Sequence, residues 1–139
     1  MEPLTVAGTL DSLEAIAKYT IEAARHANLD RKTAYKLRLA MDELATNIIV
    51  HGYREAHREG ILTIQAELSD RVLKISSIDT GIPYNPTLQK QPDNLDRPLN
   101  EREIGGLGVY LVRENVDRWT YQRVGDRNIN TLTIDRHSC

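Results

Sequence analysis

The stretch Leu39-Ala-Met-Asp-Glu-Leu-Ala-Thr-Asn-Ile-Ile-Val-His-Gly-Tyr53 decides the fold and contains the first candidate site residues. Apolar residues recur here at helical spacing, which predicts an amphipathic helix with one buried stripe: Leu37, Met41, Leu44 and Ile48. Glu43, Asn47 and His51 follow one another at four-residue intervals, so their side chains line up along the rim of that stripe. Because an asparagine inside a helix costs helix propensity, this line of polar groups indicates a site.

The composition is that of one ordinary globular domain. The chain has 139 residues, of which 40% are hydrophobic and 27% charged, and we expect a single domain over residues 1–139. A net charge of −2 gives no electrostatic case for binding nucleic acid or an anionic membrane. No run approaches the roughly 18 apolar residues of a membrane span. The single cysteine, Cys139, excludes an internal disulfide and a cysteine-built metal site, and a cytoplasmic location is the simplest expectation.

Hydrophobic periodicity predicts the order strand, helix, helix, two strands, lid, helix and two strands. The first helix begins at Asp11 or Ser12, and the second is capped by Asp30 and ends at Gly52 in a left-handed conformation. The remaining elements are expected as strands over 4–9, 61–68, 72–78, 119–124 and 130–135 and a helix over 107–116. This order predicts an α+β fold, a two-layer α/β sandwich whose mostly antiparallel sheet is covered on one face by helices.

The motif Gly105-Gly-Leu-Gly108 comes directly before the last predicted helix. Glycines let the backbone approach a ligand closely, and a helix N-terminus offers N–H groups to an anion, so a phosphate is the expected guest. A tight structural turn explains the same glycines equally well. No Gly-Lys-Ser or Gly-Lys-Thr occurs, which excludes a P-loop. The polar segment 86–104 contains three prolines and is predicted to be a lid.

Three further polar residues have two interpretations each. Asp79 follows a predicted strand, and its carboxylate either accepts a hydrogen bond from the exocyclic amine of a purine or caps a turn towards Gly81. Glu43 and Asn47 are either a solvated helix edge or a functional pair. In the functional interpretation, the amide oxygen of Asn47 ligates Mg²⁺ beside phosphates, and Glu43 deprotonates an attacking hydroxyl. His51 is expected to be a packed histidine at the helix end.

Taken in this order, the motifs resemble the Bergerat (GHKL) ATP-binding fold of gyrase and histidine kinases, and most of all the anti-sigma factor serine/threonine kinases. Glu43-Leu-Ala-Thr-Asn47, followed by His51-Gly-Tyr53, resembles their N-box. Asp79-Thr-Gly-Ile-Pro-Tyr-Asn-Pro86 is similar to their first glycine box, and Gly105-Gly-Leu-Gly108 to their second. The element order agrees from about residue 5 to 135, so the resemblance covers nearly the whole chain.

The resemblance implies ATP and Mg²⁺ as cofactors. It implies that Asn47 ligates the metal and that Glu43 is the general base. It places Asp79 and Gly81 at adenine, with Thr131 as a further adenine contact. The second glycine box would contact the phosphates through its backbone at four residues: Gly105, Gly106, Leu107 and Gly108. The segment 86–104 would be the ATP lid.

The resemblance also implies an activity and partners. Such kinases phosphorylate a serine or threonine of a STAS-domain anti-sigma factor antagonist, bind a sigma factor or similar partner, and commonly work as homodimers. Three positions depart from the pattern. Thr80 stands where the first glycine box usually has a second acidic residue, and Pro83 stands where histidine kinases have a second glycine. Ile104 stands where some anti-sigma factor kinases have an arginine. An arginine at position 104 could stabilise phosphate charge during transfer, and Ile104 cannot. The alternative is therefore a nucleotide-gated protein-binding module without kinase activity.

Overall fold

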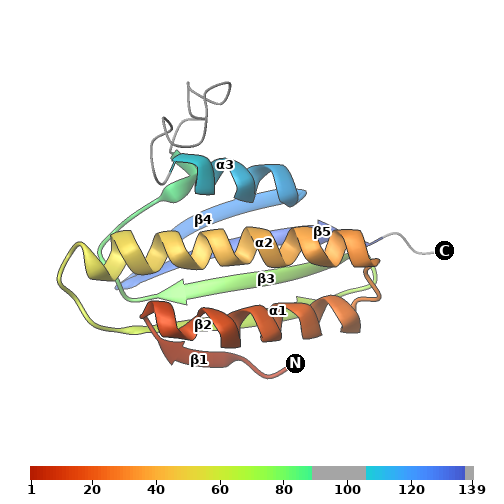
Figure 1. The fold of residues 1–139 in the computed structure, drawn as a ribbon, viewed down its shortest axis with the longest axis horizontal. Helices are drawn as coiled ribbons and strands as arrows, with labels where there is room; N and C mark the ends of the chain where they lie inside the picture. The colour runs from red at the N-terminus through yellow and green to blue at the C-terminus, as the bar shows by residue number, and fades with distance from the viewer. Residues whose placement is uncertain (89–105, 137–139) are drawn as a thin grey trace.

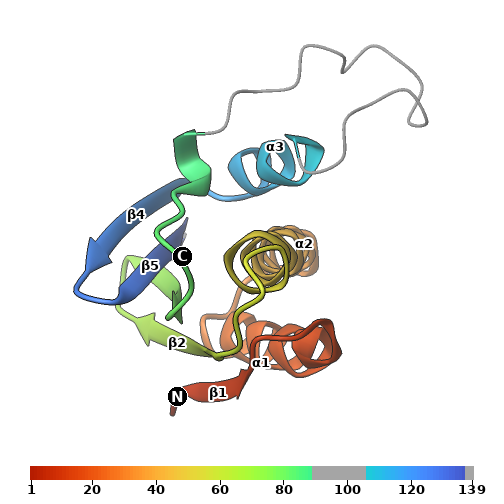
Figure 2. The same ribbon diagram turned by 90° about the vertical axis from the view of Figure 1, so that its left-hand side faces the viewer.

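The computed structural model describes residues 1–88 and 106–136. Five strands form one sheet in the order β1-β2-β3-β5-β4, and every neighbouring pair is antiparallel. The α-helices of the described residues all lie on the same face of this sheet (Figures 1 and 2). The predicted α+β sandwich is therefore confirmed. None of these helices is long and apolar enough to cross a membrane.

The elements follow one another in the predicted order. The strands are β1 (Leu4–Ala7), β2 (Ile61–Leu68), β3 (Val72–Asp79), β4 (Arg118–Val124) and β5 (Arg127–Asp135). The α-helices are α1 (Leu13–His26), α2 (Arg31–Asn47) and α3 (Gly106–Asn115). The other helical segments are η1 (Leu10–Ser12), η2 (Ile48–Arg54) and η3 (Pro86–Leu88).

Helix α2 organises the core because it packs against both α1 and α3 (Figure 2). Its start is the predicted one, since the side chain of Asp30 accepts a hydrogen bond from the backbone N–H of Thr33 at 2.7 Å. The predicted stripe is fully buried, with no member more than 1% exposed: Leu37, Met41, Leu44 and Ile48. It faces the apolar residues of the sheet, which joins the two layers.

Helix α1 begins differently from the prediction. Asp11 and Ser12 belong to the short helix η1, and the hydroxyl of Ser12 donates to the carbonyl of Ala7 at 2.7 Å instead of capping α1. The helix ends at His26, and Asn28 adopts a left-handed φ of 56° just beyond it. The hydroxyl of Ser12 therefore ties the start of α1 to β1.

The predicted helix end at Gly52 is wrong. The chain continues as the π-helix η2 (Ile48–Arg54), in which the N–H of Glu55 donates to the carbonyl of Val50 at 2.8 Å. The carbonyl of Gly52 accepts a hydrogen bond from Ile82 at 3.4 Å. This wider turn therefore connects the end of the long helix to the segment after β3.

Tyr53 fixes the end of η2 against the sheet. It is 1% exposed, and its hydroxyl donates to the carbonyl of Ile61 at 2.6 Å and accepts from the N–H of Thr80 at 2.8 Å. A Cβ at Gly60 would lie 2.6 Å from the ring of Tyr53. Close packing here therefore holds the C-terminal end of β3 beside the end of η2.

Gly60→Ala is expected to lower the free energy of unfolding by about 1–3 kcal/mol, because the added methyl group overpacks against the ring of Tyr53. Urea denaturation followed by circular dichroism measures the change. Glu59→Ala is the matched control at the exposed neighbouring residue, with an expected change within about 0.5 kcal/mol. Equal stabilities of the two variants would contradict this account of the contact.

Candidate functional site

Glu43 and Asn47 lie one turn apart at the C-terminal end of α2 and differ in burial. Asn47 is 6% exposed, and its Oδ1 accepts a hydrogen bond from the hydroxyl of Tyr84 at 2.9 Å. Glu43 is partly buried; desolvation raises the pKa of its carboxyl, and the neighbouring charge of Asp42 raises it further. The pair is therefore not the solvated helix edge of the simpler interpretation.

Asp79 ends β3 as a buried carboxylate, 2% exposed. Its Oδ1 accepts from the N–H of Gly81 and from Nδ2 of Asn128, each at 2.9 Å. Burial raises the pKa of this carboxyl, while the hydrogen bonds from Asn128 and Gly81 and the charge of Arg123 oppose the rise. The predicted turn cap is therefore confirmed, and no hydrogen bond from the described residues uses Oδ2.

Both glycine motifs contact the end of the long helix. A Cβ at Gly81 would lie 2.7 Å from the carbonyl oxygen of Gly52, so only glycine permits this approach. A Cβ at Gly108 would lie 3.0 Å from Oε2 of Glu43. Segments far apart in sequence therefore lie against the long helix at two positions, with Gly108 beside Glu43 in α2 and Gly81 beside Gly52 in η2.

Part of the second glycine motif and most of the predicted lid cannot be compared with the structure. Gly106 begins α3 and Leu107 lies in its first turn, as expected for a motif that opens a helix. Gly105 and residues 89–104 lie outside the described residues. Of the predicted lid, only Pro86–Leu88 is described, and it forms η3.

Thr131 does not join this cluster. Successive side chains of a strand point to opposite faces, and the face towards the helices carries the buried residues Asn128, Asn130 and Leu132. Thr131 lies on the other face, where its hydroxyl is 2.9 Å from that of Ser76. The β5 residue that reaches Asp79 is Asn128, which lies before the strand start predicted at residue 130 and was therefore not among the predicted site residues. Alternation extended backwards from Leu132 could have identified it.

His51 lies beside Tyr84 and interacts with the site through that residue's ring. Its Nδ1 pairs with Glu55, and its ring lies 5.5 Å from that of Tyr84 at an interplanar angle of 52°. The side chain is 32% exposed, so this histidine is only partly packed. The interactions of its ring are therefore with Glu55 and Tyr84.

The residues around Asn47 fit a magnesium ion that phosphates help to hold. Within residues 1–88 and 106–136, no three His, Cys, Asp or Glu side chains gather as they would around a protein-held metal. The candidate donor is the neutral amide oxygen of Asn47. Mg²⁺ prefers oxygen and is commonly bound by few protein groups plus substrate phosphates and water, so this donor set fits it.

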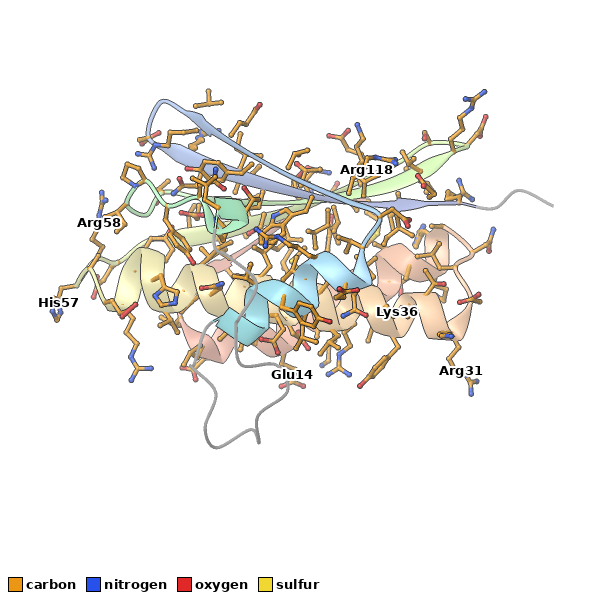
Figure 3. The ribbon with its side chains drawn as sticks, turned by 90° about the horizontal axis from the view of Figure 1, so that it is seen from above. Glu14, Arg31, Lys36, His57, Arg58 and Arg118 are labelled. Atoms are coloured by element: carbon orange, nitrogen blue, oxygen red, sulfur yellow. The ribbon has the colours of Figure 1, made fainter. Side chains whose placement is uncertain are left out.

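A separate cavity of about 660 Å³ lies at the other end of the helix layer. Its lining combines acidic and basic side chains, among them Lys36, Glu114, Asp117 and Arg136. Figure 3 labels Lys36 at this end of the molecule, and His57 and Arg58, which follow η2, at the opposite end. None of the described motif residues lines the cavity, so it is not part of the candidate site.

Residues 6–134 match the family model of the histidine kinase-like ATPase domain. The chain therefore belongs to the histidine kinase-like ATPase domain family. Among curated relatives it is similar to the serine/threonine-protein kinase BtrW of Bordetella bronchiseptica, with 34% identity over 100 residues, which cover 71% of this chain and 68% of BtrW. It is also similar to the serine-protein kinase RsbW of Staphylococcus aureus, with 31% identity over 86 residues, which cover 60% of this chain but only 54% of RsbW.

Solved structures share the fold at low sequence identity. A structure of RsbU and RsbW domains from Mycobacterium tuberculosis aligns with a TM-score of 0.63 and 18% identity, covering 96% of this chain and 32% of that one. A histidine kinase domain from Erythrobacter litoralis aligns with a TM-score of 0.54 and 18% identity, covering 91% of this chain and 60% of that one. These alignments agree with the α+β architecture described above.

Proposed function

We propose that this protein binds ATP with Mg²⁺ and transfers the γ-phosphoryl group to a serine or threonine of a STAS-domain anti-sigma factor antagonist. It also binds a sigma factor or a similar partner, and it works as a homodimer. Membership of an ATPase domain family and similarity to proteins named serine/threonine-protein kinases support the ATP-dependent reaction. The observation that carries the proposal is the convergence of Glu43, Asn47 and Asp79 with Gly81 and Gly108.

Asp79 supplies the base recognition in this proposal. Its Oδ1 is occupied by Gly81 and Asn128, so Oδ2 is the oxygen that accepts a hydrogen bond from the exocyclic amine of adenine. Guanine presents a carbonyl at the corresponding position. Its oxygen and Oδ2 of Asp79 are both acceptors, so neither would have a hydrogen-bond donor. This arrangement favours ATP over GTP.

The phosphates lie towards α3 in this proposal. Gly106 begins the helix, and the N–H groups of its first turn are donors for an anion. Asn47 Oδ1 would hold the metal ion from the side of α2. When bound, Mg²⁺ neutralises charge that develops on the phosphate oxygens.

Glu43 acts as the general base. A serine or threonine hydroxyl transfers its proton to the carboxylate while its oxygen attacks the γ-phosphorus, and ADP leaves. Burial and the charge of Asp42 raise the pKa of Glu43, which makes its carboxylate a stronger base. The absence of a side chain at Gly108 leaves Oε2 free to approach the hydroxyl.

Asn128→Val is expected to weaken ATP binding by about tenfold or more, because Asp79 loses a hydrogen bond that holds its carboxylate in place. Thr131→Val is the control: it removes a hydroxyl on the opposite face of the sheet and keeps the side-chain volume nearly the same. This variant should leave the dissociation constant for ATP unchanged. Isothermal titration calorimetry with Mg-ATP measures both. An equal loss in the two variants would restore Thr131 as a base contact.

Calorimetry on the unaltered protein tests the binding half of the proposal. We expect saturable binding of ATP that becomes weaker when EDTA removes Mg²⁺. No detectable binding at millimolar Mg-ATP would contradict both the kinase and the nucleotide-gated alternative.

A further inference from the structure

Tyr84 connects the two ends of the candidate nucleotide site. Its hydroxyl donates to Oδ1 of Asn47 at 2.9 Å, and its backbone N–H donates to Oδ1 of Asn128 at 3.4 Å. Asn128 in turn donates to Asp79 at 2.9 Å. Tyr84 is therefore hydrogen-bonded both to Asn47, the candidate metal ligand, and to Asn128, which holds the candidate adenine-binding carboxylate of Asp79.

Neighbouring groups hold the Tyr84 side chain in place. The ring of His51 packs against it at 5.5 Å, and His51 is itself paired with Glu55. Pro83 precedes Tyr84, and its ring fixes its own φ. The backbone segment that carries the tyrosine therefore has restricted conformational freedom. The phenol oxygen therefore stands at a defined position beside the end of α2.

The hydrogen bond from Tyr84 bears on which way the amide group of Asn47 is turned. Asparagine presents an oxygen on one side and an NH₂ group on the other, and only the oxygen can ligate a cation. A carbonyl oxygen has two lone pairs, so Oδ1 can accept from Tyr84 through one and face a metal through the other. Hydrogen bonds to a metal ligand from a neighbouring group commonly set its orientation.

We propose that Tyr84 is a positioning residue that orients the amide of Asn47 so that Oδ1 faces the metal ion. This inference rests on the proposed function, since it assigns a role within the same site. It also gives a use to the departure at Pro83, because the proline takes the place of a flexible glycine directly before the positioning residue.

Tyr84→Phe tests the inference because it removes the hydroxyl and keeps the ring against His51. Calorimetry gives the dissociation constant of a non-hydrolysable ATP analogue with Mg²⁺ and again with EDTA. We expect the gain in affinity from Mg²⁺ to fall by about tenfold or more, which is the usual effect of losing a group that orients a metal ligand. The affinity in EDTA should stay unchanged, and the thermal unfolding temperature should fall only slightly, because one hydrogen bond is lost.

Tyr121→Phe is the matched control. The hydroxyl of Tyr121 donates to Oδ1 of Asn128, on the side of the site that faces Asp79, so this variant should keep the full gain from Mg²⁺. A Tyr84→Phe protein that keeps the full gain, exceeds it, or loses affinity equally with and without Mg²⁺ would overturn the positioning role. If the unaltered protein binds the analogue without any gain from Mg²⁺, the proposed metal site fails, and this inference fails with it.

Discussion

Glu43→Gln is expected to slow phosphoryl transfer by about 10²–10⁴-fold, the usual effect of losing a general base. The amide keeps the shape of the side chain beside Gly108 but cannot take the proton of the attacking hydroxyl. The affinity for Mg-ATP should stay nearly unchanged, because Glu43 acts on the attacking hydroxyl and not on the nucleotide. Initial rates with labelled ATP and a STAS-domain substrate give the first quantity, and calorimetry gives the second.

Asp42→Asn is the control for this prediction. Asp42 is the neighbouring carboxylate; burial also raises its pKa, and it lies 3.7 Å from Arg38. Transfer should persist in this variant. The rate should fall as the pH drops through the pKa of Glu43, at a midpoint above the ordinary glutamate value, and Asp42→Asn should move that midpoint down because a neighbouring negative charge is removed. A slow Asp42→Asn beside a fully active Glu43→Gln would mean that the base is wrongly assigned.

Asp79→Asn is expected to weaken ATP binding by about 10- to 150-fold, which corresponds to the roughly 1.5–3 kcal/mol of a hydrogen bond to a charged group. If the amide oxygen keeps the hydrogen bonds from Gly81 and Asn128, the amide NH₂ faces the exocyclic amine of adenine, donor against donor. Guanine offers a carbonyl there, so the preference for ATP over GTP should fall as well. Calorimetric titrations with both nucleotides measure these changes.

The matched control for this change is Asp135→Asn. Asp135 is paired with Arg118 at 2.7 Å and lies near the end of β5. Its substitution should leave both nucleotide affinities unaltered. Wild-type affinity for ATP in Asp79→Asn would remove Asp79 from the base site.

The long helix and its polar rim could be predicted because their causes are local. The stripe from Leu37 to Ile48 repeats at helical spacing, and Asp30 caps the helix through a residue three positions away. Continuation of the helix through Gly52 depends instead on tertiary contacts. Tyr53 is held by Ile61 and Thr80, which belong to other elements or segments of the chain, so the helix sequence itself does not predict the π-helix.

The β5 contribution shows how a strand start placed too late in the chain leaves out a site residue. A strand start at residue 130 excludes Asn128, and the inward residues of β5 are the even-numbered ones from Asn128 to Ile134. Thr131 therefore points away from Asp79, although it lies close in sequence to the right residue. The contacts of Tyr84 with Asn47 and of Gly108 with Glu43 join different elements, and only the folded arrangement reveals them.

Transfer of label from γ-labelled ATP to a purified STAS-domain protein tests the central claim most directly. The account predicts Mg²⁺-dependent label on a serine or threonine of that protein with the unaltered chain, and almost none with Glu43→Gln. ATP binding by the unaltered chain without any transfer of label would contradict the kinase assignment and favour a nucleotide-gated binding module.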